Sequence, residues 1–307
     1  MIVVFGSTGF LGSSLTKVLS QNNHVIGVSS NKIYDFKREN DQNSNALNIL
    51  LKENASETTH IFCASMRYSP KLYRESPVDV YTKNMEAFFS FMRLLIQAPP
   101  KRAILTSSFA VYGATDKIFL ETEVLHPESF SQGEFYYASA KLHQEQIFIE
   151  SCKRLGIDYS VARIPGLYGP NATLNLDSAH VLPAFIMKAL SKKSGIIDAF
   201  GTGQEKREFL YVPDLIRIYE MLTERSVGIV NVSNQQVISI KELAQFVEAF
   251  VKTEVRFKFK GTGVSDINVR EVSNKAFLDL FPDFQFSSFE LGLENTINWY
   301  IQNFRGN

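Results

Sequence analysis

Tyr137 and Lys141 are the residues in this sequence best suited by type and spacing to transfer a proton. A free tyrosine has a pKa of about 10 and is a poor acid or base at neutral pH. Because residues four apart share one helix face, the lysine ammonium can stabilise the phenolate and lower that pKa. Ser107 and Ser108 follow the strand-like segment 102–105, and open α/β sheets bind ligands at the carboxyl ends of their strands. A serine there could hold a substrate oxygen while the tyrosine exchanges its proton.

A glycine motif follows the apolar segment 2–5 directly and reads Gly6-Ser7-Thr8-Gly9-Phe10-Leu11-Gly12. The β-branched segment predicts a buried parallel strand, and apolar residues at helical spacing predict a helix after the glycines. In a dinucleotide-binding turn the glycines permit the tight turn, the approach of backbone to a pyrophosphate, and close packing of helix on strand. Free N–H groups at the helix start then attract the phosphates. Strand, glycines and helix in this order indicate nucleotide binding rather than an empty glycine turn.

Strands alternate with helices through the first half of the chain, which predicts an α/β fold with a doubly wound parallel sheet. We expect strands at 2–5, 24–28, 60–64, 103–106 and 159–164, helices at 46–52, 78–95 and 137–155, and a return of the chain near 33–35. Beyond Pro165 the pattern changes. There we expect helices at 181–190, 240–251 and 289–304 and a strand at 255–260.

Composition indicates an ordinary globular protein and excludes several partner classes. The 307 residues carry 32 Lys+Arg and 32 Asp+Glu, so no global field favours nucleic acid or a membrane surface. Cys63 and Cys152 are expected to be buried thiols, since two cysteines give neither a disulfide framework nor a metal site. The start has no basic leader and no apolar stretch is long enough to span a bilayer. These features predict a cytoplasmic protein without a metal.

The chain resembles the extended short-chain dehydrogenases/reductases of the NAD-dependent epimerase/dehydratase family, which act on nucleotide sugars. The resemblance covers nearly the whole chain. It rests on the glycine motif, on Tyr137 with Lys141, on Pro77 with Asn84, and on the segments 60–64, 106–113, 163–170 and 201–214. It implies a Rossmann-type dinucleotide-binding domain at 1–165 and 205–238. It also implies a smaller α/β substrate-binding domain at 166–204 and 239–307.

The resemblance also implies roles for individual residues. Ser108 rather than Ser107 is the catalytic serine, Tyr137 the acid–base, Lys141 its partner and His180 a catalytic histidine. Substrate contacts are expected from Ser108, Asn84, His180, Val181, Lys188 and Arg207. Cofactor contacts are expected from Gly6, Thr8, Gly9, Phe10, Leu11, Gly12, Ser29, Ser30, Asn31, Lys32, Asp35, Phe36, Ala64, Ser65, Asn84, Thr106, Tyr137, Lys141 and Ile164, with Asp35 beside the adenine ring.

Within the family, the likeness is strongest to GDP-fucose synthase and its 4-keto-sugar reductase relatives, through segments 167–170 and 178–184. That enzyme carries a cysteine base where this chain has Ala110, so double epimerisation at C3 and C5 is not expected. Dehydratases of the family carry Asp and Glu where Phe109 and Ala110 stand, which argues against dehydration. Many relatives have an asparagine in place of Gly166, so the grip on the diphosphate differs.

The resemblance favours a 4-keto reductase. A 4-epimerase with tightly bound NAD would use the same residues, and a non-catalytic NAD(P)-binding regulator is a second alternative. Proteins of that second kind usually lose the tyrosine or the lysine, whereas both are present here.

The end of the second strand favours NADP over NAD. NAD-specific sheets place an acidic residue there to bind the adenosine ribose. This chain has Val28-Ser29-Ser30-Asn31-Lys32, whose hydroxyl, amide and ammonium groups can donate hydrogen bonds to a 2′-phosphate. Arg38 could add a charge, while use of NAD without preference stays an alternative.

Helices 78–95 and 137–155 carry more apolar residues than one core face needs, including Phe88, Phe89, Phe91, Ile147, Phe148 and Ile149. Extended family members pair these two helices across a two-fold axis, which predicts a homodimer joined by a four-helix bundle. Burial under the chain's own second domain is the alternative.

Overall fold

The computed structural model describes residues 1–29, 32–35, 40–42, 55–63, 75–113, 118–130, 133–192, 194–261 and 271–304, with the backbone alone at 32–35 and 40–42. The expected helix 46–52 lies outside these residues, as do the expected cofactor contacts Ser30, Asn31, Phe36, Ala64 and Ser65. No helix in the described ranges combines the length and apolarity needed to cross a bilayer.

Eight described strands form one large sheet in the order β11-β7-β6-β5-β1-β2-β3-β4. The pairs from β11 to β2 are all parallel, as the alternating pattern predicts. The pairs β2–β3 and β3–β4 are antiparallel, so the sheet is mostly rather than wholly parallel. The bounds are β1 Ile2–Phe5, β2 Val25–Ser29, β3 Lys32–Asp35, β4 Asn40–Gln42, β5 Thr59–Phe62, β6 Arg102–Ser108, β7 Asp158–Ile164 and β11 Gly228–Asn231.

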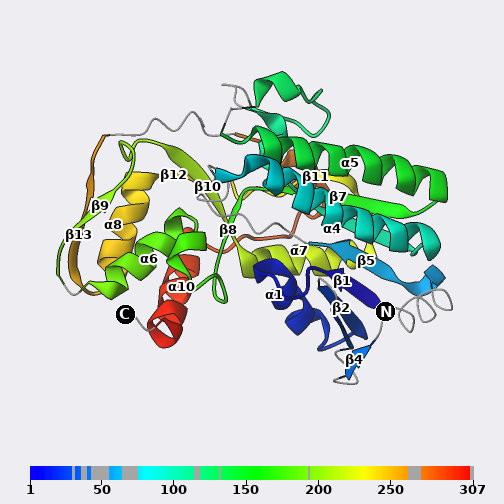
Figure 1. The fold of residues 1–307 in the computed structure, drawn as a ribbon, viewed down its shortest axis with the longest axis horizontal. Helices are drawn as coiled ribbons and strands as arrows, with labels where there is room; N and C mark the ends of the chain where they lie inside the picture. The colour runs from blue at the N-terminus through cyan, green and yellow to red at the C-terminus, as the bar shows by residue number, and fades with distance from the viewer. Residues whose placement is uncertain are drawn as a thin grey trace.

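Helices cover both faces of this sheet (Figure 1). Successive strand residues point to opposite faces, so Val4 packs with helices α1 (Phe10–Leu19) and α7 (Val212–Glu224). Val3 packs on the other face with α4 (Pro77–Gln97) and α5 (Phe135–Leu155). The doubly wound arrangement expected from the sequence is therefore present.

Local sequence accounts for where the long helices begin and end. Pro77 stands at the start of α4, where its missing N–H removes no helical hydrogen bond. Gly156 follows α5 with φ 65° and ψ 31°, the left-handed conformation that glycine adopts readily at a helix end. Ser239 and Glu242 form a capping box at the start of α8 (Ile240–Phe250), which satisfies two otherwise free backbone donors.

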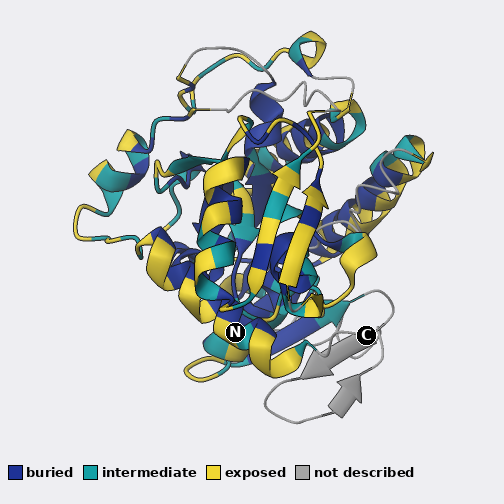
Figure 2. Ribbon diagram, turned by 90° about the vertical axis from the view of Figure 1, so that its left-hand side faces the viewer, coloured by how far each residue is buried: buried dark blue, intermediate teal, exposed yellow. Residues whose placement is uncertain are grey.

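A smaller part lies to one side of the large sheet (Figure 1, left) and has its own apolar core. It contains helices α6 (Val181–Ser191), α8 and α10 (Phe289–Asn303) and the parallel pair β9 (Ser194–Ala199) and β13 (Glu254–Phe259). Figure 2 shows its outer surface exposed and its inner faces buried. A separate three-stranded sheet of β8 (Gly166–Tyr168), β10 (Lys206–Tyr211) and β12 (Val237–Ser239) lies between the large sheet and the smaller part (Figure 1).

One segment of the range 239–307 packs with the large sheet. Phe277 of α9 (Lys275–Leu280) is fully buried in the core shared by α1 and α7. Asp214 of α7 accepts hydrogen bonds from both the N–H and the hydroxyl of Ser287, each at 2.8 Å. The domain boundaries expected from the sequence stay a prediction, and this packing would assign 275–287 to the sheet.

Half of the apolar residues expected at a dimer interface belong to the chain's own core. Phe88, Phe91 and Phe148 are fully buried beneath the sheet face that carries α4 and α5. Phe89 is 45% exposed and Ile147 is 38% exposed. Only part of the apolar surplus of these helices therefore remains for another chain.

Candidate active site

The carboxyl ends of the central strands bring several of the expected catalytic and cofactor residues to one edge of the sheet. Gly6 follows β1, while Ser108 and Ile164 end β6 and β7 and lie opposite each other in the parallel register. Because all these strands run in one direction, their ends meet at the same edge. Open α/β sheets bind ligands at this edge.

The glycine turn has the backbone geometry of a phosphate-binding turn. Gly6 has φ 88°, and its carbonyl accepts a hydrogen bond from the Gly9 N–H at 2.9 Å. A Cβ atom on Gly12 would lie 2.0 Å from the Gly6 carbonyl oxygen, so only glycine lets α1 pack this closely on the turn. The first turn of α1 has no side-chain cap and no acidic residue. Its free N–H groups and positive dipole end fit the pyrophosphate of a dinucleotide.

Two neighbouring serines have different environments. Ser107 is buried, and its hydroxyl has no hydrogen-bond partner among the described residues. Ser108 is half-buried and caps the short helix η2 (Phe109–Tyr112), its Oγ accepting from the Ala110 N–H at 3.2 Å. Ser108 is therefore the more accessible of the two serines, and its catalytic role stays a prediction.

Lys141 reaches the same edge from α5. It is buried, and its Nζ donates a hydrogen bond to the Thr106 carbonyl at 2.9 Å. Burial lowers the pKa of Lys141 to about 8, and the nearby Glu145 carboxylate opposes that shift. Tyr137 lies one turn earlier on α5 and is half-buried. The helix thus places an accessible phenol beside a buried lysine, next to the strand that carries Ser108.

The end of β2 turns back through a hairpin. Ser29 pairs with Lys32 at the carboxyl end, whereas Asp35 pairs with Ile26. The antiparallel strand β3 therefore carries the backbone of Asp35 away from the edge where the glycine turn lies, and the expected contact with the adenine ring stays a prediction. The Thr8 and Ser29 hydroxyls are hydrogen-bonded at 2.5 Å, joining the glycine turn to this strand.

The expected substrate contacts lie on different elements. Asn84 is buried on α4, and its backbone carbonyl accepts from the Gln144 side chain at 3.3 Å. His180 caps α6 and Val181 begins it, while Lys188 stands in the last turn. Although the His180 side chain is exposed, nearby protein atoms desolvate its imidazole and lower its pKa.

Arg207 lies on β10, half-buried, and donates to the Lys206 carbonyl at 2.7 Å. These residues of α6 and β10 belong to the smaller part and its bridging sheet, not to the edge that carries Ser108 and Lys141.

The sequence reasoning missed a buried polar group behind the site. Arg163 on β7 pairs with Glu145 on α5 at 2.7 Å, and both are at most 3% exposed. Tyr219 on α7 is hydrogen-bonded to the Thr106 hydroxyl. Arg163 could have been noticed, because a charged residue within a buried apolar strand requires a partner. Tyr219 gave no signal, since its partner is remote in the sequence.

Comparisons with known proteins identify the family to which the chain belongs. The model of the NAD dependent epimerase/dehydratase family matches residues 2–233. UDP-glucuronic acid decarboxylase 6 of Arabidopsis thaliana is 25% identical over 276 residues, which cover 84% of this chain and 76% of that protein.

Two solved structures share the fold across 98% of this chain. A UDP-N-acetylglucosamine 4-epimerase from Methanobrevibacter ruminantium M1 has a TM-score of 0.79 at 23% identity and is itself 98% covered. A GDP-L-fucose synthetase from Naegleria fowleri bound to NADP has a TM-score of 0.74 at 20% identity and is 94% covered. With a family model spanning most of its length, the chain belongs to the NAD-dependent epimerase/dehydratase family, whose members modify nucleotide sugars.

Proposed function

We propose that this protein is an NAD(P)-dependent 4-keto reductase of nucleotide-diphosphate sugars. The observation that supports the proposal is that Ser108 and Lys141 meet at the edge that also holds the glycine turn, with Tyr137 one turn before Lys141 on α5. Fold alone would not support a specific reaction. These side chains supply what reduction of a carbonyl needs.

The chain's own groups act on the carbonyl oxygen and on the proton. When bound, the reduced nicotinamide would supply the hydride that attacks the carbonyl carbon. The Ser108 hydroxyl donates a hydrogen bond to the carbonyl oxygen and orients it. Tyr137 donates its phenolic proton to that oxygen as negative charge develops, so the ketone becomes an alcohol. The Lys141 ammonium stabilises the resulting phenolate until solvent returns the proton.

The residues after Ser108 argue for hydride transfer without further ring chemistry. Phe109 and Ala110 are both buried, and neither can accept a proton. Removal of a proton next to a 4-keto group needs a base there, and the family's fucose synthases use a cysteine at the position of Ala110. His180 alone would not complete that acid–base pair.

The test is a panel of nucleotide sugars and 4-keto nucleotide sugars, with NAD(P)H absorbance and product stereochemistry followed in deuterated water. The proposal expects net cofactor oxidation with 4-keto sugars and no deuterium at C3 or C5. A 4-epimerase would interconvert two sugars without net cofactor oxidation. Solvent deuterium at C3 or C5 would contradict the absence of double epimerisation.

We favour NADP(H) as the cofactor because the β2 end presents Ser29 and, opposite it in the hairpin, Lys32. No acidic residue stands at this end to repel a 2′-phosphate. Parallel fluorescence titrations with NADPH and NADH test the choice. NADH binding tenfold tighter than NADPH would overturn it.

We also propose a cytoplasmic homodimer joined through α4 and α5, which binds neither nucleic acid nor a membrane. Val78, Phe89 and Ile96 on α4 and Ile147 on α5 remain exposed on these helices. A second copy of the same face would cover them. Sedimentation at micromolar concentration should give a dimer that Phe89→Glu weakens, and a monomer in the unmodified protein would remove the proposal.

A further inference from the structure

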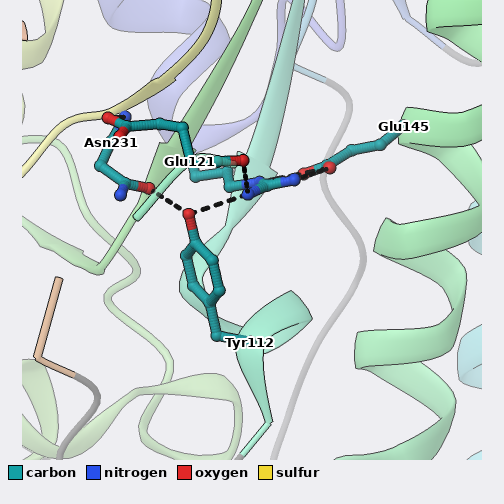
Figure 3. A network of polar contacts seen from close by, with 5 residues as sticks. Tyr112, Glu121, Glu145 and Asn231 are labelled. Atoms are coloured by element: carbon teal, nitrogen blue, oxygen red, sulfur yellow. Dashed lines mark hydrogen bonds and ion pairs between the residues drawn. The ribbon is translucent and has the colours of Figure 1, made fainter. Parts of the chain in front are cut away.

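Arg163 stands at the centre of a buried chain of polar side chains, whose members Tyr112, Glu121, Glu145 and Asn231 are labelled in Figure 3. Its Nε donates to the two carboxylate oxygens of Glu145 at 3.0 and 3.2 Å, and its Nη2 donates to Oε2 at 2.7 Å. Its Nη1 donates to the Tyr112 hydroxyl at 2.8 Å, which in turn donates to Oδ1 of Asn231 at 2.7 Å. Apart from Glu121, these residues are all at most 2% exposed.

This chain joins the two elements that carry the catalytic groups. Glu145 lies one turn after Lys141 on α5. Tyr112 ends η2, the short helix that Ser108 caps. Arg163 on β7 therefore holds α5 with one end of its guanidinium and the turn of Ser108 with the other.

The chemistry of this arrangement indicates that it fixes the relative position of its partners rather than raising the stability of the fold. A buried ion pair contributes little net stability compared with apolar residues of the same volume. A guanidinium is instead planar and rigid, with donors in a fixed fork. Such a group sets the relative position of two partners more narrowly than apolar contacts can.

We propose, building on the reductase function above, that Glu145, Arg163 and Tyr112 form a positioning unit for the catalytic groups. In this unit Arg163 and Tyr112 set the place of Ser108 relative to α5, and Glu145 keeps Lys141 protonated. None of the three touches the reacting atoms.

Among the described residues, few groups near Lys141 could keep it protonated as Glu145 does. Its own helix supplies Glu145, and the end of β5 supplies the buried Cys63, whose pKa is raised to about 12 by burial. Tyr219 of α7 lies behind the strand through Thr106 and is neutral. Cys63 and Tyr219 therefore carry no charge near neutral pH. Among the residues that the structure describes, this leaves Glu145, which is itself paired with Arg163, as the negative charge near the ammonium.

The first part of the proposal, that Arg163 and Tyr112 position Ser108, is called the positioning half. It is tested with Tyr112→Phe, which removes the hydroxyl and no charge. We expect kcat to fall roughly tenfold with KM unchanged, because an interaction that acts on the transition state alone has been lost. The control is Tyr300→Phe, which removes a buried hydroxyl bonded to the Thr173 carbonyl at 2.7 Å in the smaller part. Equal losses in both variants, or no loss in Tyr112→Phe, would overturn this half.

The second part of the proposal, that Glu145 keeps Lys141 protonated, is called the charge half. It is tested without any substrate, so its outcome is independent of the reductase proposal. Lysines labelled with carbon-13 at Cε are titrated by NMR, and the Lys141 signal is assigned by its absence in Lys141→Met. We expect Glu145→Gln to lower the Lys141 midpoint by about one pH unit, as removal of a nearby opposite charge does. Glu150→Gln is the control, because Glu150 is an exposed residue of the same helix that pairs with Arg154.

An unchanged midpoint in Glu145→Gln would overturn the charge half, as would an equal shift in Glu150→Gln. If Glu145→Gln does not fold, Glu145→Asp replaces it, since it withdraws the carboxylate by one methylene. A smaller shift in the same direction then supports the role of Glu145, and no shift overturns it. Failure of every nucleotide sugar in the panel, with the midpoint shifted as expected, would refute the reductase function and leave the charge effect standing.

Discussion

Ser108 and Lys141 reach one edge of the sheet from a strand end and from a helix, and burial divides their roles. Ser108 stays accessible, while Lys141 is withdrawn behind the Thr106 carbonyl. A buried ammonium is favoured less than one in water, which is why its pKa falls to about 8. At the residue scale, a half-buried phenol and a buried lysine thus lie one turn apart on the same helix, as the proposed proton transfer requires.

Replacement of the phenol tests this arrangement. Tyr137→Phe should leave folding and cofactor binding intact and lower turnover by about 10²–10⁴-fold, the usual contribution of a general acid–base. Tyr136→Phe, on the preceding residue of the same helix and also half-buried, should keep near-normal turnover. Steady-state kinetics on the substrate found with the panel measures both. Near-normal turnover of Tyr137→Phe would reassign the proton donor.

At the element scale, strand β1, the glycine turn and α1 form one unit whose packing depends on an absent side chain. Gly12 approaches the Gly6 carbonyl so closely that any Cβ would displace the turn. The unit needs no charged side chain to bind a phosphate, since backbone N–H groups and the helix dipole suffice.

Gly12→Ala should therefore weaken NADPH binding at least about tenfold, because the N–H groups move out of alignment. Gly133→Ala is the matched control, since, apart from its chain neighbours, no described atom lies within 4 Å of its added Cβ. Fluorescence titration measures the affinity, and circular dichroism checks that both variants are folded. Equal affinity in the two variants would exclude the turn as the phosphate site.

The end of β2 is the second element with a defined test. Ser30→Asp places a carboxylate in the segment that follows Ser29, where it would repel a 2′-phosphate and bind ribose hydroxyls. We expect the ratio of NADPH to NADH affinity to move toward NADH. A ratio unaffected by the substitution would place the adenosine ribose elsewhere.

The sequence predicts strongly periodic elements well and partner-dependent ones poorly. Helices α4 and α5 begin and end close to the expected residues, because Pro77 and Gly156 are local signals. The return of the chain near 33–35 was expected, but its pairing with β2 as the antiparallel strand β3 was not, since that pairing depends on a hairpin whose signal is weak. Helix α9 was missed because its six residues are held by Phe277 in a distant core.

The site divides along the same line. Motifs within one short segment, such as the glycine turn and the Tyr137–Lys141 pair, were visible from spacing alone. The contacts of Arg163 reach 18 residues back to Glu145 and 51 residues back to Tyr112. No local pattern marks such a network, and only the fold brings its members together.

At the scale of the whole molecule, two buried groups give stability opposite dependences on pH. Burial lowers the pKa of His60 to about 3 and raises that of Glu208 to about 7. Unfolded histidine binds a proton below about 6.5, so the His60 contribution is lost as pH falls from 6.5 toward 3. Glu208 is protonated in the folded state, so its contribution is lost as pH rises from about 4.5 to 7.

Between about pH 4.5 and 6.5, His60 and Glu208 change the free energy of unfolding with pH in opposite directions. Single substitutions should separate the two contributions. His60→Phe should make the free energy of unfolding fall more steeply with rising pH, by up to about 1.4 kcal/mol per pH unit. Glu208→Gln, which can still accept from Ser233 and Asn234, should make it rise. Denaturant unfolding across this range measures both. Parallel curves for the two variants would contradict the opposed slopes.

The path of the chain past Phe277 bears on how the protein can be divided. The polypeptide leaves the large sheet after β7, comes back for α7 and β11, leaves again for α8 and β13, and comes back once more to insert Phe277 and the Ser287 contact with Asp214. A fragment that stops at residue 239 would keep every strand of the large sheet but lose Phe277 from its hydrophobic core. The two parts are therefore interwoven rather than modular. An exchange of the smaller part between relatives would have to keep Phe277 together with the large sheet on which it packs.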